Sequence, residues 1–135
     1  AWLLLVIVVT WRGDSGAYLI GRSFGRQPLN PVVSPKKTVE GFVGGLACAA
    51  LTGLVAVELF GLGIHWSIGL ALGFVLGLIA VLGDLVESVL KRQAGVKDSG
   101  TLIPGHGGML DRLDALLFTW TAGWYLALLA DRMFQ

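Results

Sequence analysis

Long apolar blocks alternate with short polar segments along this chain. The apolar blocks cover residues 1–20, 39–62, 66–90 and 110–133. A helix that crosses a bilayer needs about 20 predominantly apolar residues, and each block is long enough. The pattern therefore predicts an all-α fold, a polytopic transmembrane helix bundle with about four spanning helices.

Composition agrees with a membrane protein rather than a soluble one. Of the 135 residues, 55% are hydrophobic and only 14% are charged, whereas a soluble domain carries about 25% charged residues. The net charge of +1 argues against nucleic acid as a partner. The single cysteine, Cys48, lies within an apolar block, and we expect it to be a small buried hydrophobe.

The first apolar block carries two charged residues near its middle, Arg12 and Asp14. Ionisable residues at membrane depth are costly, and they usually face a bundle interior or an aqueous cavity. Two interpretations stay open. Either a helix runs through 1–20 and the charges are functional, or it stops near Trp11 and they lie at the interface.

The segment 21–37 is predicted to be a loop, because three prolines interrupt it. Ser34 is a candidate N-cap for the next helix, with Pro35 at the first helical position. Lys36 and Lys37 follow directly. They either bind phosphate groups or only mark the cytoplasmic side of the membrane.

Glycines recur at four-residue spacing in the third block, at Gly69, Gly73 and Gly77. This pattern lets helices approach closely in lipid, either within one chain or between two. In steps of three or four residues, the same face continues through Ala80, Asp84, Glu87 or Ser88, and Lys91. We therefore expect the carboxylate of Asp84 to point into the bundle.

Charge predicts the topology of the spans. The segments 21–37 and 91–109 are basic, whereas the connection 61–65 carries neither Lys nor Arg. Positively charged segments tend to stay in the cytoplasm. With the predicted spans, both basic segments fall on one side, so the polar site is expected at the cytoplasmic face.

Three carboxylates are expected to converge at that face. Asp111 and Asp114 are three residues apart at the start of the last helix, and Asp84 lies near the end of the preceding one. Carboxylates in a low-dielectric setting repel one another unless they are protonated or bridged by a cation. Their oxygens suit Mg²⁺, which commonly binds one or two carboxylates together with substrate phosphates. The alternative is that Asp111 or Asp114 pairs with a neighbouring basic side chain.

Basic and glycine-rich positions surround these carboxylates. The cations are Lys91, Arg92, Lys97 and Arg112, and Ser88 lies beside them. Arginine binds phosphate oxygens bidentately, whereas lysine supplies a point charge. The loop 105–108 precedes a helix N-terminus, where the backbone N–H groups of Gly107 and Gly108 suit an anion. His106 either contacts phosphate or only fixes this loop. Together these groups are the parts of phosphoryl or nucleotidyl transfer.

The same stretch resembles the signature of the phosphatidate cytidylyltransferases (CDP-diacylglycerol synthases). The resemblance rests on Ser88-x-x-Lys91-Arg92, Lys97-Asp98, Pro104-Gly105-His106-Gly107-Gly108 and Asp111-Arg112-x-Asp114. Two upstream segments are also similar, Asp14-Ser15-Gly16-Ala17-Tyr18 and Ser34-Pro35-Lys36-Lys37-Thr38-Val39-Glu40-Gly41. The resemblance implies an enzyme of phospholipid biosynthesis that makes CDP-diacylglycerol and pyrophosphate from CTP and phosphatidic acid.

The resemblance also implies roles for individual residues. Catalytic roles are expected for Asp84, Lys91, Arg92, Asp111 and Asp114. Substrate-binding roles are expected for Asp14, Lys36, Lys37, Ser88, Lys97, Asp98, His106, Gly107, Gly108 and Arg112. Mg²⁺ is expected on Asp84, Asp111 and Asp114, and a second cation is left open.

Residues 1–135 are expected to form a single transmembrane catalytic domain. The chain enters an apolar run at Ala1 without an initiator Met or a signal-peptide pattern, so we expect the C-terminal part of a longer chain. The resemblance also implies a homodimer. We expect the protein in the bacterial inner membrane, with the site facing the cytoplasm.

Two rival functions remain at this point. A CTP-dependent lipid or polyprenol kinase would transfer the γ-phosphoryl group and release CDP instead of pyrophosphate. An ion transporter would use Asp14, Asp84 and the glycine face as an ion path, although the charges cluster at one face instead of spanning the membrane.

Overall fold

The computed structural model describes residues 1–31, 34–95 and 110–134, and for 34–36, 110–117, 131, 133 and 134 it describes the backbone alone. Within these residues there are four long helices and one two-stranded hairpin. The elements are α1 (Trp2–Phe24), β1 (Pro28–Asn30), β2 (Ser34–Thr38), α2 (Val39–Leu59), α3 (Trp66–Gln93) and α4 (Leu110–Phe134). The predicted helix bundle is confirmed, with the hairpin as an addition.

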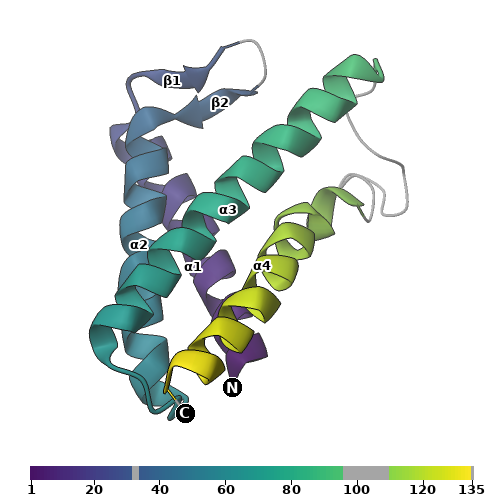
Figure 1. Cartoon of the computed structure of the whole chain (residues 1–135). Helices are drawn as coiled ribbons and strands as arrows, with labels where there is room; N and C mark the ends of the chain where they lie inside the picture. The colour runs from purple at the N-terminus through teal and green to yellow at the C-terminus, as the bar shows by residue number, and fades with distance from the viewer. Residues whose placement is uncertain (32–33, 96–109, 135) are drawn as a thin grey trace.

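The helices run alternately in opposite directions (Figure 1). α1 packs against α2 and α4, and α3 packs against the same two helices. The hairpin lies at the end of the bundle where α3 finishes and α4 begins (Figure 1). Both chain termini and the α2–α3 connection lie at the opposite end (Figure 1). The two basic segments therefore start and finish at the same end, as the charge pattern predicts.

The helices have the length and exterior of membrane spans. Among the described residues, α1, α2 and α3 are long and apolar enough to cross a membrane. α4 has 25 residues, and at about 1.5 Å per residue it also exceeds the roughly 30 Å hydrocarbon core. Large apolar side chains are exposed on the outer faces, among them Leu3, Leu4, Trp11, Leu19, Val43, Leu51, Val55, Leu70, Phe74 and Leu82. Such a surface suits lipid, and the protein is an integral membrane protein.

The apolar core lies where α1, α2 and α3 meet. It contains Leu5, Val6, Val9, Ala49, Ala56, Val57 and Leu76. A polar contact joins α1 to α4 beside it. The Thr10 hydroxyl donates to the Val6 carbonyl oxygen at 2.8 Å, and its oxygen lies 3.3 Å from that of Thr119. Such interhelical contacts contribute on average about 0.6 kcal/mol in a bilayer.

The predicted glycine face of α3 packs against α2 within the same chain. A Cβ added at Gly73 would lie 3.0 Å from the Ala50 Cα, and one at Gly77 would lie 2.7 Å from the Ala49 Cβ. These distances are too short for any side chain larger than hydrogen, so the two backbones meet directly. Of the two uses left open for this face, the structure shows the intrachain one.

α1 and α2 make a second close contact that the sequence analysis missed. A Cβ at Gly45 would lie 2.8 Å from the Ala17 Cβ, and one at Gly41 would lie 3.0 Å from the Gly21 Cα. The signal was present in the sequence, because Gly13, Ala17 and Gly21 have the same four-residue spacing as the glycines of α3.

α1 continues without a break through Arg12 and Asp14 to Phe24. The interpretation in which the helix stops near Trp11 is therefore wrong. The helix also extends beyond the apolar block 1–20 into the segment predicted to be a loop. Its end is closed by the Gly25 N–H, which donates to the Gly21 carbonyl oxygen at 3.0 Å.

The rest of that segment forms the antiparallel hairpin, with Asn30 opposite Ser34. The prediction that Ser34 caps the next helix is wrong, because Ser34 and Pro35 belong to β2. Proline is tolerated in an edge strand, where its missing N–H removes no ladder hydrogen bond. The N-cap is Thr38, whose hydroxyl accepts from the Gly41 N–H at 3.1 Å.

The close contact between α2 and α3 predicts a large difference between two neighbouring substitutions. Gly73→Leu should destabilise the protein by about 1–3 kcal/mol, because the new side chain has no room against α2. Ala71→Leu, on the exposed face of α3, should stay within about 0.5 kcal/mol. Thermal unfolding in detergent compares the two, and equal effects would show that the α2–α3 packing is not this tight.

Candidate active site

A cavity of about 420 Å³ lies at the hairpin end of the bundle, between α1, α2, α3 and the hairpin. Its charged and polar lining consists of Asp14, Tyr18, Arg22, Lys37, Thr38 and Asp84. The remaining lining is apolar or glycine: Ala17, Gly21, Leu29, Gly41, Phe42 and Val81. Two acids and two bases thus face one space between helices of a membrane protein, where charges are rare and usually functional.

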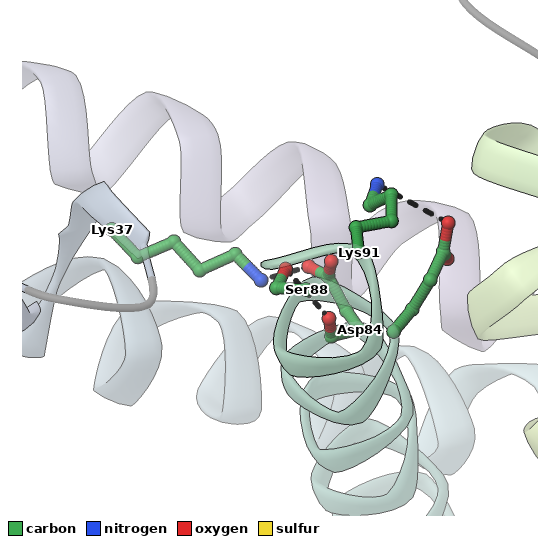
Figure 2. A network of polar contacts seen from close by, with 5 residues as sticks. Lys37, Asp84, Ser88 and Lys91 are labelled. Carbon is green, nitrogen blue, oxygen red and sulfur yellow. Dashed lines mark hydrogen bonds and ion pairs between the residues drawn. The ribbon is translucent and has the colours of Figure 1, made fainter. Parts of the chain in front are cut away.

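Lys37 on β2 forms an ion pair with Asp84 on α3 (Figure 2). The two side chains are 31% and 39% exposed, so both remain accessible from the cavity. Asp84 points into the bundle, as its position on the glycine face predicts. The pair joins segments that lie far apart in the sequence, and it brings a cation and a carboxylate from the predicted site together.

The hairpin that carries Lys37 is tied to the start of α2. The Val39 N–H donates to the Gln27 carbonyl oxygen at 2.9 Å. The Gln27 N–H donates in turn to a carboxylate oxygen of Glu40 at 3.3 Å. Together with the Thr38 cap, these bonds hold the strand at a defined position above the cavity. They give a structural role to Glu40 in the segment that resembles the family.

The last turns of α3 carry a second pair of charges. Lys91 Nζ lies 3.2 Å from Oε1 of Glu87, whose side chain is only 7% exposed. Ser88, predicted to bind substrate, donates its hydroxyl to the Asp84 carbonyl oxygen at 2.9 Å. Glu87 was predicted to lie on this face of α3, but it was not among the predicted site residues.

α1 contributes to the cavity through residues at four-residue spacing. Asp14 and Arg22 line it, and the Arg22 guanidinium donates to the Tyr18 hydroxyl at 3.2 Å. Arg22 was missed because it was assigned to a loop, although its spacing from Asp14 and Tyr18 was a usable signal. Arg12 lines a separate groove with Cys48 on the α1–α2 surface.

The structure describes only part of the predicted site. Arg92 is exposed at the end of α3. The backbones of Lys36, Asp111, Arg112 and Asp114 belong to β2 and to the start of α4, and their side chains lie outside the described atoms. Lys97, Asp98, His106, Gly107 and Gly108 lie outside the described residues altogether. Their predicted roles therefore stay predictions.

The packing of α3 against α4 places the start of α4 relative to the site. A Cβ at Gly83 would lie 2.6 Å from a ring carbon of Phe118, so these two positions are level. The two helices are antiparallel (Figure 1). Asp114 lies one turn before Phe118, and Glu87 lies one turn after Gly83. Asp114 and Glu87 are therefore at the same height along the bundle. Asp111 and Asp114 thus belong to the same end of the bundle as the polar turns of α3.

The fold and the cavity define a polytopic membrane protein with a charged site among its helices. A model of the Cytidylyltransferase family matches residues 1–130, and the chain belongs to this family. The family indicated by the signature residues is therefore confirmed.

Individual relatives agree with this assignment. Proteins named phosphatidate cytidylyltransferase from Staphylococcus saprophyticus and Staphylococcus aureus (strain COL) are 48% and 45% identical over 117 residues. Each match covers 87% of this chain and 45% of the relative, so the chain spans less than half of the relatives' length. A solved structure of an intramembrane enzyme for archaeal membrane lipids biosynthesis has a TM-score of 0.69 at 22% identity, covering 91% of this chain and 76% of that one. This likeness shows a shared fold.

The Lys37–Asp84 contact predicts that the hairpin can be cross-linked to α3. In a Cys48→Ala background, the pair Lys37→Cys and Asp84→Cys should react with a short bifunctional thiol reagent. The pair Lys37→Cys and Val86→Cys is the control, because Val86 is exposed on another face of α3. Gel mobility and mass spectrometry of the cross-linked peptide report the outcome, and equal yields for both pairs would contradict this placement of the hairpin.

Proposed function

We propose that this protein is a membrane-embedded phosphatidate cytidylyltransferase, which makes CDP-diacylglycerol and pyrophosphate from CTP and phosphatidic acid. The observation that supports the proposal is the Lys37–Asp84 pair, since it brings an ammonium group, which suits phosphate, beside a carboxylate in a cavity among apolar helices. Family membership and the names of the relatives support the same reaction.

The reaction transfers a cytidylyl group between two phosphates. An oxygen of the phosphatidic acid phosphate attacks the α-phosphorus of CTP and forms a new P–O bond. The bond between the α-phosphorus and the bridging oxygen breaks, and pyrophosphate leaves with its electron pair. The attacking phosphate is already an anionic nucleophile, so the protein needs no general base. The barrier comes mainly from the charge repulsion between two polyanions.

Basic side chains on both sides of α3 oppose this repulsion. Lys37 and Arg22 face the cavity, and Lys91 and Arg92 belong to the last turn of α3. Asp84 neutralises Lys37 in the structure. A phosphate oxygen of a substrate can replace this carboxylate as the partner of the ammonium, which keeps the lysine charged and oriented before substrate arrives.

The chemistry of the site suits Mg²⁺. Asp84 already accepts a positive group, the ammonium of Lys37, so its surroundings accommodate a cation. Among the described side chains, no three acidic, His or Cys groups form a metal cluster. The proposal therefore depends on Asp111 and Asp114 as further ligands beside Asp84. Bound there, the ion would neutralise phosphate charge and polarise a phosphoryl oxygen.

We place the site at the cytoplasmic side of a bacterial membrane. The two basic segments attach to the hairpin end of the bundle (Figure 1), and such segments usually stay in the cytoplasm. CTP would enter from that side, while the acyl chains of phosphatidic acid would remain in lipid beside the helices. A homodimer stays a prediction, and its interface must lie outside the glycine face that α2 occupies.

Turnover of labelled CTP with phosphatidic acid in detergent and Mg²⁺ tests the proposal. The protein should release CDP-diacylglycerol and pyrophosphate, and chelation of the metal should stop the reaction. Asp84→Asn should lower kcat about 100-fold or more, because it removes a charge at the reacting phosphates. Glu58→Gln, an exposed carboxylate far from the cavity, is the matched control and should change the rate less than about twofold.

Other products would change the assignment. A phosphorylated lipid together with CDP would identify a kinase. If the folded protein forms no lipid product, both enzymatic functions are wrong, and cation flux in vesicles becomes the next measurement. An active Asp84→Asn variant would remove this carboxylate from the mechanism.

A further inference from the structure

Glu87 differs from every other charged residue whose side chain the structure describes. It is the one buried acid or base among them, with 6% of its surface exposed. A carboxylate is costly to bury unless a cation compensates its charge. Lys91 supplies compensation of this kind: its Nζ lies 3.2 Å from Oε1, and its own side chain is 23% exposed.

Helix stability alone does not require this burial. A glutamate four residues before a lysine supports a helix equally well on an exposed face. Buried ion pairs, in contrast, are often replaced by apolar side chains without loss of stability. A buried carboxylate beside a partly exposed lysine at the polar end of α3 is therefore better explained by a need to hold Lys91 in one place.

The direction of this pair is set by the packing of α3. Gly83 contacts Phe118 of α4, and Glu87, four residues later, lies on the same face of α3. Asp84 lies about 100° around the helix from Gly83, and it meets Lys37 from the hairpin. Figure 2 shows the two contacts on different sides of α3, with the Lys91 contact on the side of α4.

We propose that Glu87 is a positioning residue that holds Lys91 on the α4 side of α3, ready for a substrate phosphate. Lys37 and Asp84 serve the hairpin side of the same helix, so the two lysines address phosphates from different directions. The inference rests on the proposed function in one respect, namely that Lys91 acts on a phosphate of CTP or of phosphatidic acid.

A double-mutant cycle on turnover tests the proposal. Glu87→Gln should lower kcat by up to about 100-fold with little change in the KM for CTP, because a misplaced charge weakens transition-state stabilisation. In a Lys91→Met background, the same substitution should change kcat less than about twofold, since its effect acts through Lys91. Glu58→Gln is the control for loss of a carboxylate, and thermal unfolding of each variant checks its fold.

The reactivity of Lys91 gives a second readout that needs no catalysis. The rate at which a water-soluble succinimidyl ester acylates Lys91 is followed by peptide mass spectrometry, with Lys37 as the internal reference. Glu87→Gln should speed the acylation of Lys91 several-fold, because the carboxylate no longer holds the ammonium. The rate at Lys37, whose partner Asp84 is unchanged, should stay the same.

The outcomes separate this inference from the proposed function. A protein that forms no CDP-lipid but shows the selective change at Lys91 supports the positioning role and contradicts the enzyme. Equal acylation rates in the parent and Glu87→Gln overturn the positioning role, whatever the activity. Additive losses of kcat for Glu87→Gln and Lys91→Met in the double-mutant cycle also overturn the positioning role. A Glu87→Gln variant with a lowered unfolding temperature but an unchanged kcat overturns it too. Glu87→Gln alone could fail to fold, and the double variant Glu87→Gln, Lys91→Met is then compared with the single variant Lys91→Met. A far lower activity of the double variant would overturn the positioning role as well.

Discussion

Charge at membrane depth must be neutralised inside the helix bundle, and most features of this structure follow from that constraint. An acid facing lipid would be expensive, so Asp84 and Glu87 each meet a lysine on a protected side of α3. One lysine comes from the hairpin and the other from the next turn of the same helix. The hairpin is therefore part of the charge balance of the bundle as well as a connection between α1 and α2.

Close approach of the helices makes this arrangement possible. Glycines and alanines at four-residue spacing bring α1 and α3 against α2 so closely that backbone atoms meet. Lipid supplies no hydrophobic drive between helices, so such packing contacts stabilise the bundle. The same small residues leave space at the hairpin end, where Gly21 and Gly41 line the cavity. The small residues at four-residue spacing thus produce both the close helix packing and the space of the cavity.

The polar end of α3 separates two groups of charged residues. Lys37, Asp84, Asp14 and Arg22 belong to the cavity under the hairpin. Glu87 and Lys91 belong to the side that α4 covers, level with the start of that helix. The proposed reaction joins two phosphate compounds and would need cationic groups around both, and α3 carries a lysine–carboxylate pair on each of these sides.

The sequence alone determined the number and order of the helices, the glycine face of α3, the inward direction of Asp84 and the family. These properties depend on periodicity and on local residue types, which can be read without tertiary contacts. The hairpin, the Thr38 cap and the place of Arg22 in the cavity required the structure, because prolines and basic residues are compatible with a loop or a strand. The pairing of Lys37 with Asp84 and the burial of Glu87 were also decided only in three dimensions. Both depend on where the hairpin and α4 lie relative to α3, and no spacing along the chain encodes which distant segment reaches which side of a helix.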